Sequence, residues 1–441
     1  MNFKIKHLGK AWLKSPLANK EFDPKSFFVS EKKRLRYDAL VYQDKKKVLE
    51  DSSFQESFEL AGPREKVYFN PAKVRSAIIT CGGLCPGVND VIRSIVMESY
   101  YRYGNKNIFG IPFGYKGLNP KYGYSPMKLT PEKVENIHKE GGSILGSSRG
   151  GAEDKNLLVD TLVKLKINIL YAIGGDGTLK GAHEIAKIAF KRKINLAVIG
   201  IPKTIDNDIN FIERSFGFET AFSKAVDAIS SAHLEAKGAP NGIGLVKVMG
   251  RSSGFIAAHA ALAMNDTNFV LVPEVDFDLE GKNGLLSLLQ KRLKKRNHAV
   301  ICVAEGAGQK FFLDQQNSKF DESGNPVLHD IGLFLEERIK EYFSKKDIMI
   351  NLKYINPSYI IRTAPANAND SLLCALLGQY AVHAAMTGKT DMIVGNWHQA
   401  YTHVPIELVV ANKKRINPNS LIWYNVIEAT GQPFKMLNKL T

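Results

Sequence analysis

Short apolar runs of strand length alternate with longer amphipathic stretches from about residue 73 onward. The first runs span residues 74–80, 107–113, 168–174 and 196–202. Glycine-rich turns separate several of them from the stretch that follows. A strand, a glycine turn, a helix and another strand in this order are typical of a parallel sheet with crossover helices. The pattern therefore predicts an α/β domain.

The same alternation resumes further along the chain. Apolar runs recur at residues 242–250, 269–273 and 299–304, and a late run at 391–396 has the length of one more strand. We therefore expect a second α/β unit after the first.

Residues 1–70 have a different pattern. They are rich in Lys and Ser, are interrupted by Pro16, Pro24 and Pro63, and contain charge clusters such as residues 45–47. We interpret them as a partly ordered N-terminal arm that packs on or between the larger units, with its basic clusters in solvent.

Composition narrows the possibilities without choosing a function. The 441 residues suit two or three domains, and the 44% hydrophobic and 24% charged residues exclude wholesale disorder and a fibrous architecture. The net charge of +16 attracts anions, but nucleic acid, acidic lipid and phosphorylated metabolites all satisfy it. The four cysteines match neither a disulfide scaffold nor a zinc pattern. Without a signal peptide or a membrane-spanning apolar run, we expect a soluble, cytoplasmic protein.

Three turns that follow predicted strands carry residues suited to phosphate chemistry, because ligands of open α/β sheets bind at the carboxyl ends of strands. The first turn, residues 81–89, contains Gly82 and Gly83, where a phosphate could approach backbone N–H groups. Taken alone this signal is weak, because many strand-to-helix turns are glycine-rich for packing only. The turn is not a Walker loop, since no Gly-Lys-Ser/Thr follows.

The second turn, GGDGT at 174–178, places Asp176 between glycines. A carboxylate there can hold Mg²⁺ against nucleotide phosphates. The alternative interpretation is that Asp176 caps the following helix.

The third turn, PKTIDND at 202–208, holds two carboxylates. If the segment is extended, Asp206 and Asp208 point to the same side, and one could remove a proton from a substrate hydroxyl while the other positions it or a metal. The alternative is a solvated acidic turn, which does not require Lys203 and Thr204 before the pair.

Further candidates lie downstream of these turns or between them. Arg251 and Arg362 suit bidentate phosphate recognition, Glu305 suits sugar hydroxyls, and Arg149 suits nucleotide phosphates.

These motifs together resemble those of the 6-phosphofructokinases, in family order from about residue 76 to residue 396. GGDGT alone also occurs in NAD kinases and lipid kinases, but its combination with PKTIDND and MGRSSG (249–254) is highly specific. The resemblance implies two Rossmann-like, doubly wound α/β domains and an N-terminal arm. We expect the arm at 1–72, a nucleotide-binding domain at 73–217 with 361–411, and a fructose 6-phosphate-binding domain at 218–360 with 412–441.

The resemblance also implies roles for the matching residues. The family's nucleotide contacts match Gly83, Arg149, Gly150, Gly175, Asp176, Gly177 and Thr178, with Asp176 as the Mg²⁺ residue. Its catalytic residues match Asp206, the base for the 1-hydroxyl proton, together with Lys203 and Arg251. Its sugar-phosphate contacts match Thr204, Ile205, Asp206, Asp208, Met249, Gly250, Arg251, Glu305, Lys353, Tyr359 and Arg362. Lys353 falls where simpler bacterial enzymes place an Arg that reaches into the neighbouring subunit's site, and the resemblance implies a homotetramer.

The family uses either ATP or pyrophosphate as phosphoryl donor, and this sequence has features of both groups. Pyrophosphate users typically carry Asp at the position of Gly177 and Lys at that of Lys203. Gly177 leaves room for an α-phosphate and adds no negative charge, as in the ATP-dependent members known from plants and trypanosomatids. Gly242 stands where simpler bacterial enzymes have an Arg that binds substrate. We therefore do not extend the allosteric coupling between subunits of those enzymes to this chain.

We therefore predict an ATP-dependent 6-phosphofructokinase of glycolysis that uses Mg²⁺ and binds neither nucleic acid nor membrane. The alternatives are a pyrophosphate-dependent fructose 6-phosphate 1-phosphotransferase, a nucleic-acid-binding protein on a nucleotide-binding fold, and a catalytically silent regulatory subunit. Against nucleic acid, the densest basic runs lack interleaved aromatic residues. Against the silent subunit, Asp176, Lys203, Asp206 and Arg251 are intact.

Overall fold

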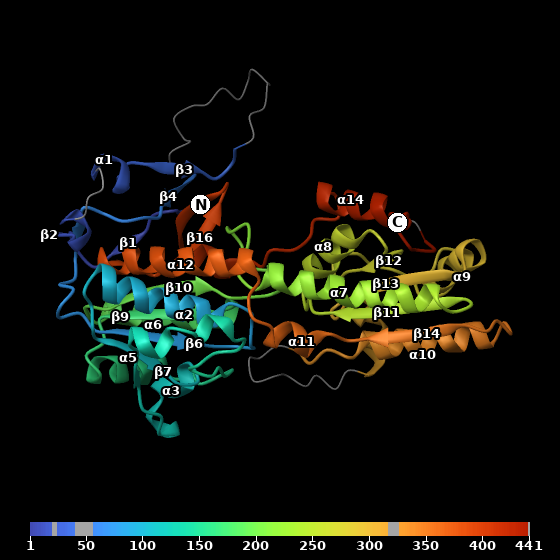
Figure 1. Ribbon diagram of the computed structural model, residues 1–441, viewed down its shortest axis with the longest axis horizontal. Coiled ribbons are helices and arrows are strands. Elements are labelled where there is room, and N and C mark those ends of the chain that lie inside the picture. Colours follow the sequence, from blue (N-terminus) through green and yellow to red (C-terminus); the bar gives the residue numbers. More distant parts are fainter. Residues whose placement is uncertain (20–23, 40–55, 316–325, 440–441) are drawn as a thin grey trace, which may run out of the picture. The chain divides into compact units, whose positions relative to one another are not determined.

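A computed structural model describes residues 1–19, 24–39, 56–315 and 326–439. The chain forms two compact units (Figure 1). Unit 1 comprises Met1–Thr204, Ile209–Gly217 and Thr363–Lys413, and unit 2 comprises Ile205–Asp208, Phe218–Arg362 and Lys414–Thr441. The described residues among 1–72, which we interpret from sequence as an arm, cluster with unit 1.

Unit 1 is built on a mixed sheet that, within the described residues, has nine strands. Their order across the sheet is β3 (Arg34–Arg36), β4 (Ser57–Leu60), β17 (Ala400–Pro405), β16 (Met392–Trp397), β10 (Ala197–Pro202), β9 (Ile169–Gly174), β6 (Ser76–Thr80), β7 (Ile108–Ile111) and β8 (Met127–Lys128). The central strands from β16 to β7 are parallel, and antiparallel strands flank them on both sides.

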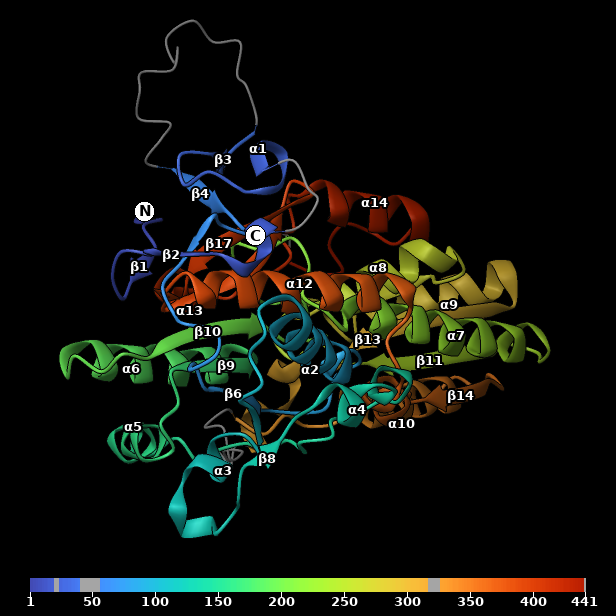
Figure 2. The ribbon, with the colours of Figure 1, turned by 60° about the vertical axis from the view of Figure 1, so that its left-hand side comes forward.

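Helices cover both faces of this sheet (Figure 2). One face packs Ala77, Leu170 and Val198 against α5 (Lys155–Lys164), α6 (Asp176–Lys191) and α13 (Ile406–Ala411). The alternate strand residues point to the other face, where α2 (Val88–Met97) packs against α12 (Ala368–Met386). Burial on both faces explains why these strands are almost continuously apolar.

The remaining elements of unit 1 are short. The helical ones are η1 (Pro16–Asn19), α1 (Pro24–Phe27), the π-helix η4 (Glu98–Arg102), α3 (Tyr115–Leu118), η5 (Pro120–Tyr122), α4 (Pro131–Val134) and η6 (Ile137–Lys139). Two small antiparallel pairs join β1 (Lys6–His7) to β15 (Lys389–Thr390) and β2 (Leu13–Lys14) to β5 (Lys66–Val67).

Unit 2 is built on a sheet of four parallel strands within the described residues, in the order β12 (Phe269–Leu271), β13 (His298–Ala304), β11 (Gly242–Val248) and β14 (Asn351–Ile355). Its helices are α7 (Phe218–Lys237), α8 (Phe255–Met264), α9 (Leu285–Arg296), η7 (Gln309–Gln315), α10 (Ile331–Ser344), α11 (Ser358–Thr363) and α14 (Leu421–Thr430). Two parallel-rich α/β units confirm the predicted fold class.

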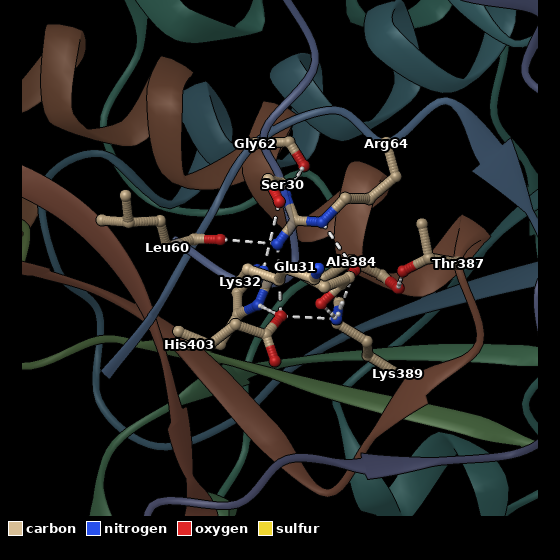
Figure 3. Close-up of polar contacts among 11 residues, drawn as sticks. Ser30, Glu31, Lys32, Leu60, Gly62, Arg64, Ala384, Thr387, Lys389 and His403 are labelled. Atoms are coloured by element: carbon tan, nitrogen blue, oxygen red, sulfur yellow. Dashed lines mark hydrogen bonds and ion pairs between the residues drawn. The ribbon is translucent and has the colours of Figure 1, made fainter. Parts of the chain in front are cut away.

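A cluster of charges, buried except at Glu31, joins the N-terminal residues to the rest of unit 1 (Figure 3). The fully buried Lys389 amine donates to Glu31, with 3.0 Å between Nζ and Oε2, and it also pairs with Glu59. The Arg64 guanidinium donates to Glu31 at 2.6 Å. The Nδ1 atom of His403 lies 2.9 Å from Glu59 Oε1. Because burial lowers the pKa of His403 to about 4, this histidine is neutral, and its Nδ1–H donates to the Glu59 carboxylate.

Candidate functional site

The first predicted turn is tied by its backbone to a second loop of unit 1. After β6 ends at Thr80, Cys81 forms a parallel bridge with Ser148, and the Gly82 N–H donates to the Ser148 carbonyl at 2.9 Å. The Ser147 hydroxyl donates to the Gly82 carbonyl at 2.7 Å. Gly82 has a φ of +90°, which favours glycine there. The turn therefore brings Gly83 to the loop that continues into Arg149 and Gly150, two other predicted nucleotide contacts.

In the second turn, the three glycines have different surroundings. A Cβ atom on Gly174 would collide with the Thr178 side chain, and one on Gly175 would lie 3.3 Å from the Lys203 carbonyl oxygen. A Cβ on Gly177 would meet nothing within 4 Å. Packing therefore requires Gly174 and disfavours a side chain at Gly175, whereas the space beside Gly177 is open to a ligand.

Asp176 is the first residue of α6, and the cap position before it belongs to Gly175, which makes no side-chain capping bond. The alternative that Asp176 caps this helix is therefore wrong. Its carboxylate instead pairs with the Lys180 amine at 2.8 Å.

A single carboxylate such as that of Asp176 suits Mg²⁺ that arrives with nucleotide phosphates. Mg²⁺ usually takes one or two carboxylates from the protein and completes its coordination shell with phosphates and water. Among the described residues, no group of three or more His, Cys, Asp or Glu side chains could hold a metal by itself.

Lys203 connects the first two turns. It follows β10, its side chain is buried, and its amine donates to the Gly83 carbonyl while its backbone N–H donates to Gly174 at 3.0 Å. Since β6, β9 and β10 are parallel neighbours, their carboxyl ends share one edge of the sheet. Unit 1 thus gathers the glycine turns, Asp176 and Lys203 at this edge.

The chain passes from unit 1 to unit 2 within the third turn, between Thr204 and Ile205. Asn207 has a φ of +52°, so the segment is not extended, and the condition for placing Asp206 and Asp208 on one side by strand alternation is not met. Their carbonyls are bound separately instead. Ser253 Oγ donates to Asp206 O at 2.9 Å, and the Lys414 N–H donates to Asp208 O at 2.9 Å.

The MGRSSG loop and Glu305 lie together at the carboxyl ends of β11 and β13. The Glu305 N–H donates to Val248 O at 2.9 Å, and the Gly306 N–H donates to Gly250 O at 3.1 Å. Gly250 has a φ of +126°, and the Arg251 guanidinium donates to the Pro326 carbonyl. The backbone of unit 2 therefore brings Met249, Gly250, Arg251 and Glu305 into one neighbourhood.

Three predicted sugar-phosphate contacts lie on or after β14. Lys353 is exposed and pairs with Gly244 in the middle of β11, so it does not join the cluster at the strand ends. Tyr359 on α11 is 79% exposed, and Arg362 on the same helix is partly buried. The structure therefore places Tyr359 and Arg362 on one helix and Lys353 apart from them on β14.

Sequence reasoning missed residues that hold the predicted ones in place. The Tyr115 hydroxyl donates to the Thr178 carbonyl at 2.7 Å. Glu274 accepts the N–H of Gly254, at the end of the MGRSSG loop, at 3.1 Å from each carboxylate oxygen. The one available signal was that Glu274, like Glu305, comes shortly after a strand.

Comparisons with known proteins show the family to which the chain belongs. The family model for phosphofructokinase matches residues 75–385. This chain belongs to the phosphofructokinase family.

Phosphofructokinase relatives match nearly the whole chain. It is 51% identical to the ATP-dependent 6-phosphofructokinase of Borreliella burgdorferi, over 99% of this chain and 98% of that protein. It is 50% identical to the chloroplastic ATP-dependent 6-phosphofructokinase 5 of Arabidopsis thaliana, over 85% of this chain and 68% of that protein. Among solved structures, the T-state phosphofructokinase of Pichia pastoris superposes with a TM-score of 0.63 at 22% identity, over 81% of this chain and 37% of that one. In the described part of this chain, no helix is long and apolar enough to cross a membrane.

Proposed function

We propose that this protein is an ATP-dependent 6-phosphofructokinase, which converts ATP and fructose 6-phosphate into ADP and fructose 1,6-bisphosphate in glycolysis. The observation that carries the proposal is the 51% identity, over almost the full length of both chains, to a curated ATP-dependent 6-phosphofructokinase. The GGDGT, PKTIDND and MGRSSG motifs support it, because they lie at the carboxyl ends of β9, β10 and β11.

The proposed reaction is a direct in-line transfer. Asp206 takes the proton of the sugar's 1-hydroxyl as that oxygen bonds to the γ-phosphorus and the bond from phosphorus to the ADP oxygen breaks. Lys203 and Arg251 carry positive charge to the phosphoryl group, and Glu305 accepts from the sugar hydroxyls. When bound, Mg²⁺ held by Asp176 and the nucleotide phosphates neutralises charge on the phosphate oxygens.

We assign the remaining predicted residues to binding. The nucleotide contacts are Gly83, Arg149, Gly150, Gly175, Gly177 and Thr178. The sugar-phosphate contacts are Thr204, Ile205, Asp208, Met249, Gly250, Tyr359 and Arg362. The exposed Lys353 suits a role toward a neighbouring copy of the chain, so we include a homotetramer in the proposal, together with a cytoplasmic location.

ATP is proposed over pyrophosphate because of the open space beside Gly177. An α-phosphate needs room and tolerates no extra negative charge there, whereas an Asp side chain would fill the space and repel it.

The test offers fructose 6-phosphate with Mg²⁺ and either ATP or pyrophosphate to the purified protein and measures fructose 1,6-bisphosphate. We expect kcat/KM with ATP to exceed that with pyrophosphate by at least about 100-fold. A preference for pyrophosphate would establish the alternative enzyme, and no product with either donor would refute the proposed function.

A further inference from the structure

Glu274 lies outside every predicted motif, yet it joins two segments of unit 2 that are far apart in sequence. Its carboxylate accepts the N–H of Gly254 with both oxygens at 3.1 Å and the N–H of Ile416 with Oε1 at 2.8 Å. Gly254 precedes α8, so the carboxylate also faces the partly positive N-terminus of that helix. One side chain therefore fixes the start of α8 to the chain segment that returns at residue 414.

Both segments hold the Asp206–Asp208 backbone. Next to Gly254, Ser253 Oγ donates to the Asp206 carbonyl at 2.9 Å, and Ser253 is fully buried. Two residues before Ile416, the Lys414 N–H donates to the Asp208 carbonyl at 2.9 Å. The Lys414 amine also lies 5.2 Å from the ring centre of Phe255, the first residue of α8. Glu274 is thus the common anchor of the two groups that bind the carbonyls on either side of Asn207.

The backbone around Glu274 fits its carboxyl group closely. A Cβ on Gly254 would lie 3.1 Å from Glu274 Oε2 and would collide with Val272, so only glycine leaves room for this contact. Burial raises the pKa of Glu274, while the N–H bonds and the charge of Arg415 oppose that shift. A carboxylate whose oxygens are occupied by backbone donors is unsuited to proton transfer and well suited to holding those donors in place.

We propose that Glu274 is a positioning residue for the phosphoryl-transfer reaction, acting through Ser253 and Lys414 to fix the backbone that carries Asp206. This inference rests on the proposed function, in which Asp206 is the base. Because a base must lie within hydrogen-bonding reach of the proton it removes, a small displacement slows the chemical step more than it weakens ground-state binding.

The decisive variant is Glu274→Gln, which keeps the size of the side chain. If the amide oxygen takes the place of Oε1, it can keep the N–H of Ile416, but the amide NH₂ then takes the place of Oε2, 3.1 Å from the Gly254 nitrogen, where two donors face each other and Gly254 is pushed away. In the opposite orientation the NH₂ faces the N–H groups of both Gly254 and Ile416. We expect kcat to fall about 10- to 100-fold, with the KM values for fructose 6-phosphate and ATP within about threefold of the parent.

Glu280→Gln is the matched control. Glu280 belongs to the same unit, its side chain is 66% exposed and it pairs with Arg338 at 3.1 Å. We expect this variant to keep the parent's kcat. If kcat of Glu274→Gln stays within about twofold of the parent, or if Glu280→Gln loses as much, the inference is overturned.

A double-mutant cycle that combines Glu274→Gln with Ser253→Ala tests whether Glu274 acts on Asp206 through Ser253. If Glu274 acts through Ser253, the two variants combined should lose much less than the product of their separate losses. Fully multiplicative losses would overturn the shared route.

Amide hydrogen exchange tests, without any assay of turnover, whether Glu274 anchors the backbone around Asp206 and Gly254. Amides in peptides covering 205–209 and 250–256 should exchange faster in Glu274→Gln than in Glu280→Gln. Unchanged exchange there would overturn the inference even in an active enzyme. If the parent instead makes no product from either donor, the proposed function fails, and the exchange comparison still decides whether Glu274 is the anchor.

Discussion

At the scale of single residues, Gly177 is the position to which we assign the choice of phosphoryl donor. Neither a positive φ nor a neighbouring atom requires glycine at this position, unlike Gly174, whose Cβ would strike Thr178. Position 177 lies in the first turn of α6, where an acidic side chain is compatible with the helix dipole. A substitution there should therefore change ligand binding without unfolding the protein.

We predict that Gly177→Asp lowers kcat/KM for ATP by at least about 100-fold, because the added carboxylate occupies the space proposed for the α-phosphate and repels it. The KM for fructose 6-phosphate and the melting temperature should stay near those of the parent. Gly177→Ala separates size from charge and should retain most ATP-dependent activity. ATP kinetics of Gly177→Asp equal to those of the parent would contradict our account of donor choice.

Asp206 carries the proposed proton transfer. Asp206→Asn keeps the shape of the side chain but removes the basic carboxylate, so kcat should fall by about 10²–10⁴. Calorimetry should show that fructose 6-phosphate still binds. Turnover close to that of the parent would remove Asp206 from its proposed role.

At the scale of elements, the strands that form the site were largely predictable. The apolar runs at 168–174, 196–202 and 299–304 correspond to β9, β10 and β13 within about a residue, because strands buried on both faces leave continuous apolar runs. The exposed edge strand β14 and the antiparallel strand β17 were missed. β14 has little buried surface to mark it, and in β17 the buried polar residues Thr402 and His403 interrupt the apolar run.

The loops at these strand ends are held by close backbone packing. A Cβ on Gly306, after β13, would collide with the Arg251 carbonyl oxygen after β11. Gly306→Ala should therefore displace the MGRSSG loop, lowering kcat about 10-fold or more and raising the KM for fructose 6-phosphate. Steady-state kinetics test this, with Gly177→Ala as the glycine variant for which the fold has space. Unchanged kinetics of Gly306→Ala would show that the loop does not depend on this contact.

At the scale of the whole molecule, the buried charge cluster makes folding depend on pH (Figure 3). The pKa of His403 is about 4 in the folded protein, below its ordinary value of 6.5. Between these values the unfolded chain binds a proton that the folded chain does not, so stability falls as the pH drops from about 6.5 toward 4. The pKa of Glu59 is lowered by His403 and Lys389 despite the opposing effect of burial, and its linkage has the same sign.

We predict that lowering the pH from 7.5 to 5 costs the parent about 2 kcal/mol more unfolding free energy than it costs His403→Gln. Gln can still donate to Glu59 but does not titrate. Urea unfolding at the two pH values measures the difference, with His398→Gln as the control because His398 is partly exposed. Equal losses in parent and His403→Gln would exclude His403 as the titrating group.

The net charge of +16 also acquires a more definite interpretation at this scale. The charge cluster contributes nothing to it, since Lys389 and Arg64 neutralise Glu31 and Glu59. Part of the excess, including Lys203, Arg251 and Arg362, lies at positions that we assign to phosphorylated anions. The charge by itself did not distinguish these uses.

By itself, the sequence determined the α/β class, the strand-end turns and the family, because periodic burial and glycine turns are local properties that leave a pattern in neighbouring residues. Only the tertiary structure showed that Gly174 is required by packing, whereas Gly177 has open space beside it. It alone joined Glu274 to Gly254 and Ile416, and Glu31 to Lys389. Such partners lie up to hundreds of residues apart, and a hydrogen bond between them depends on where folding places two backbones, which no local pattern records.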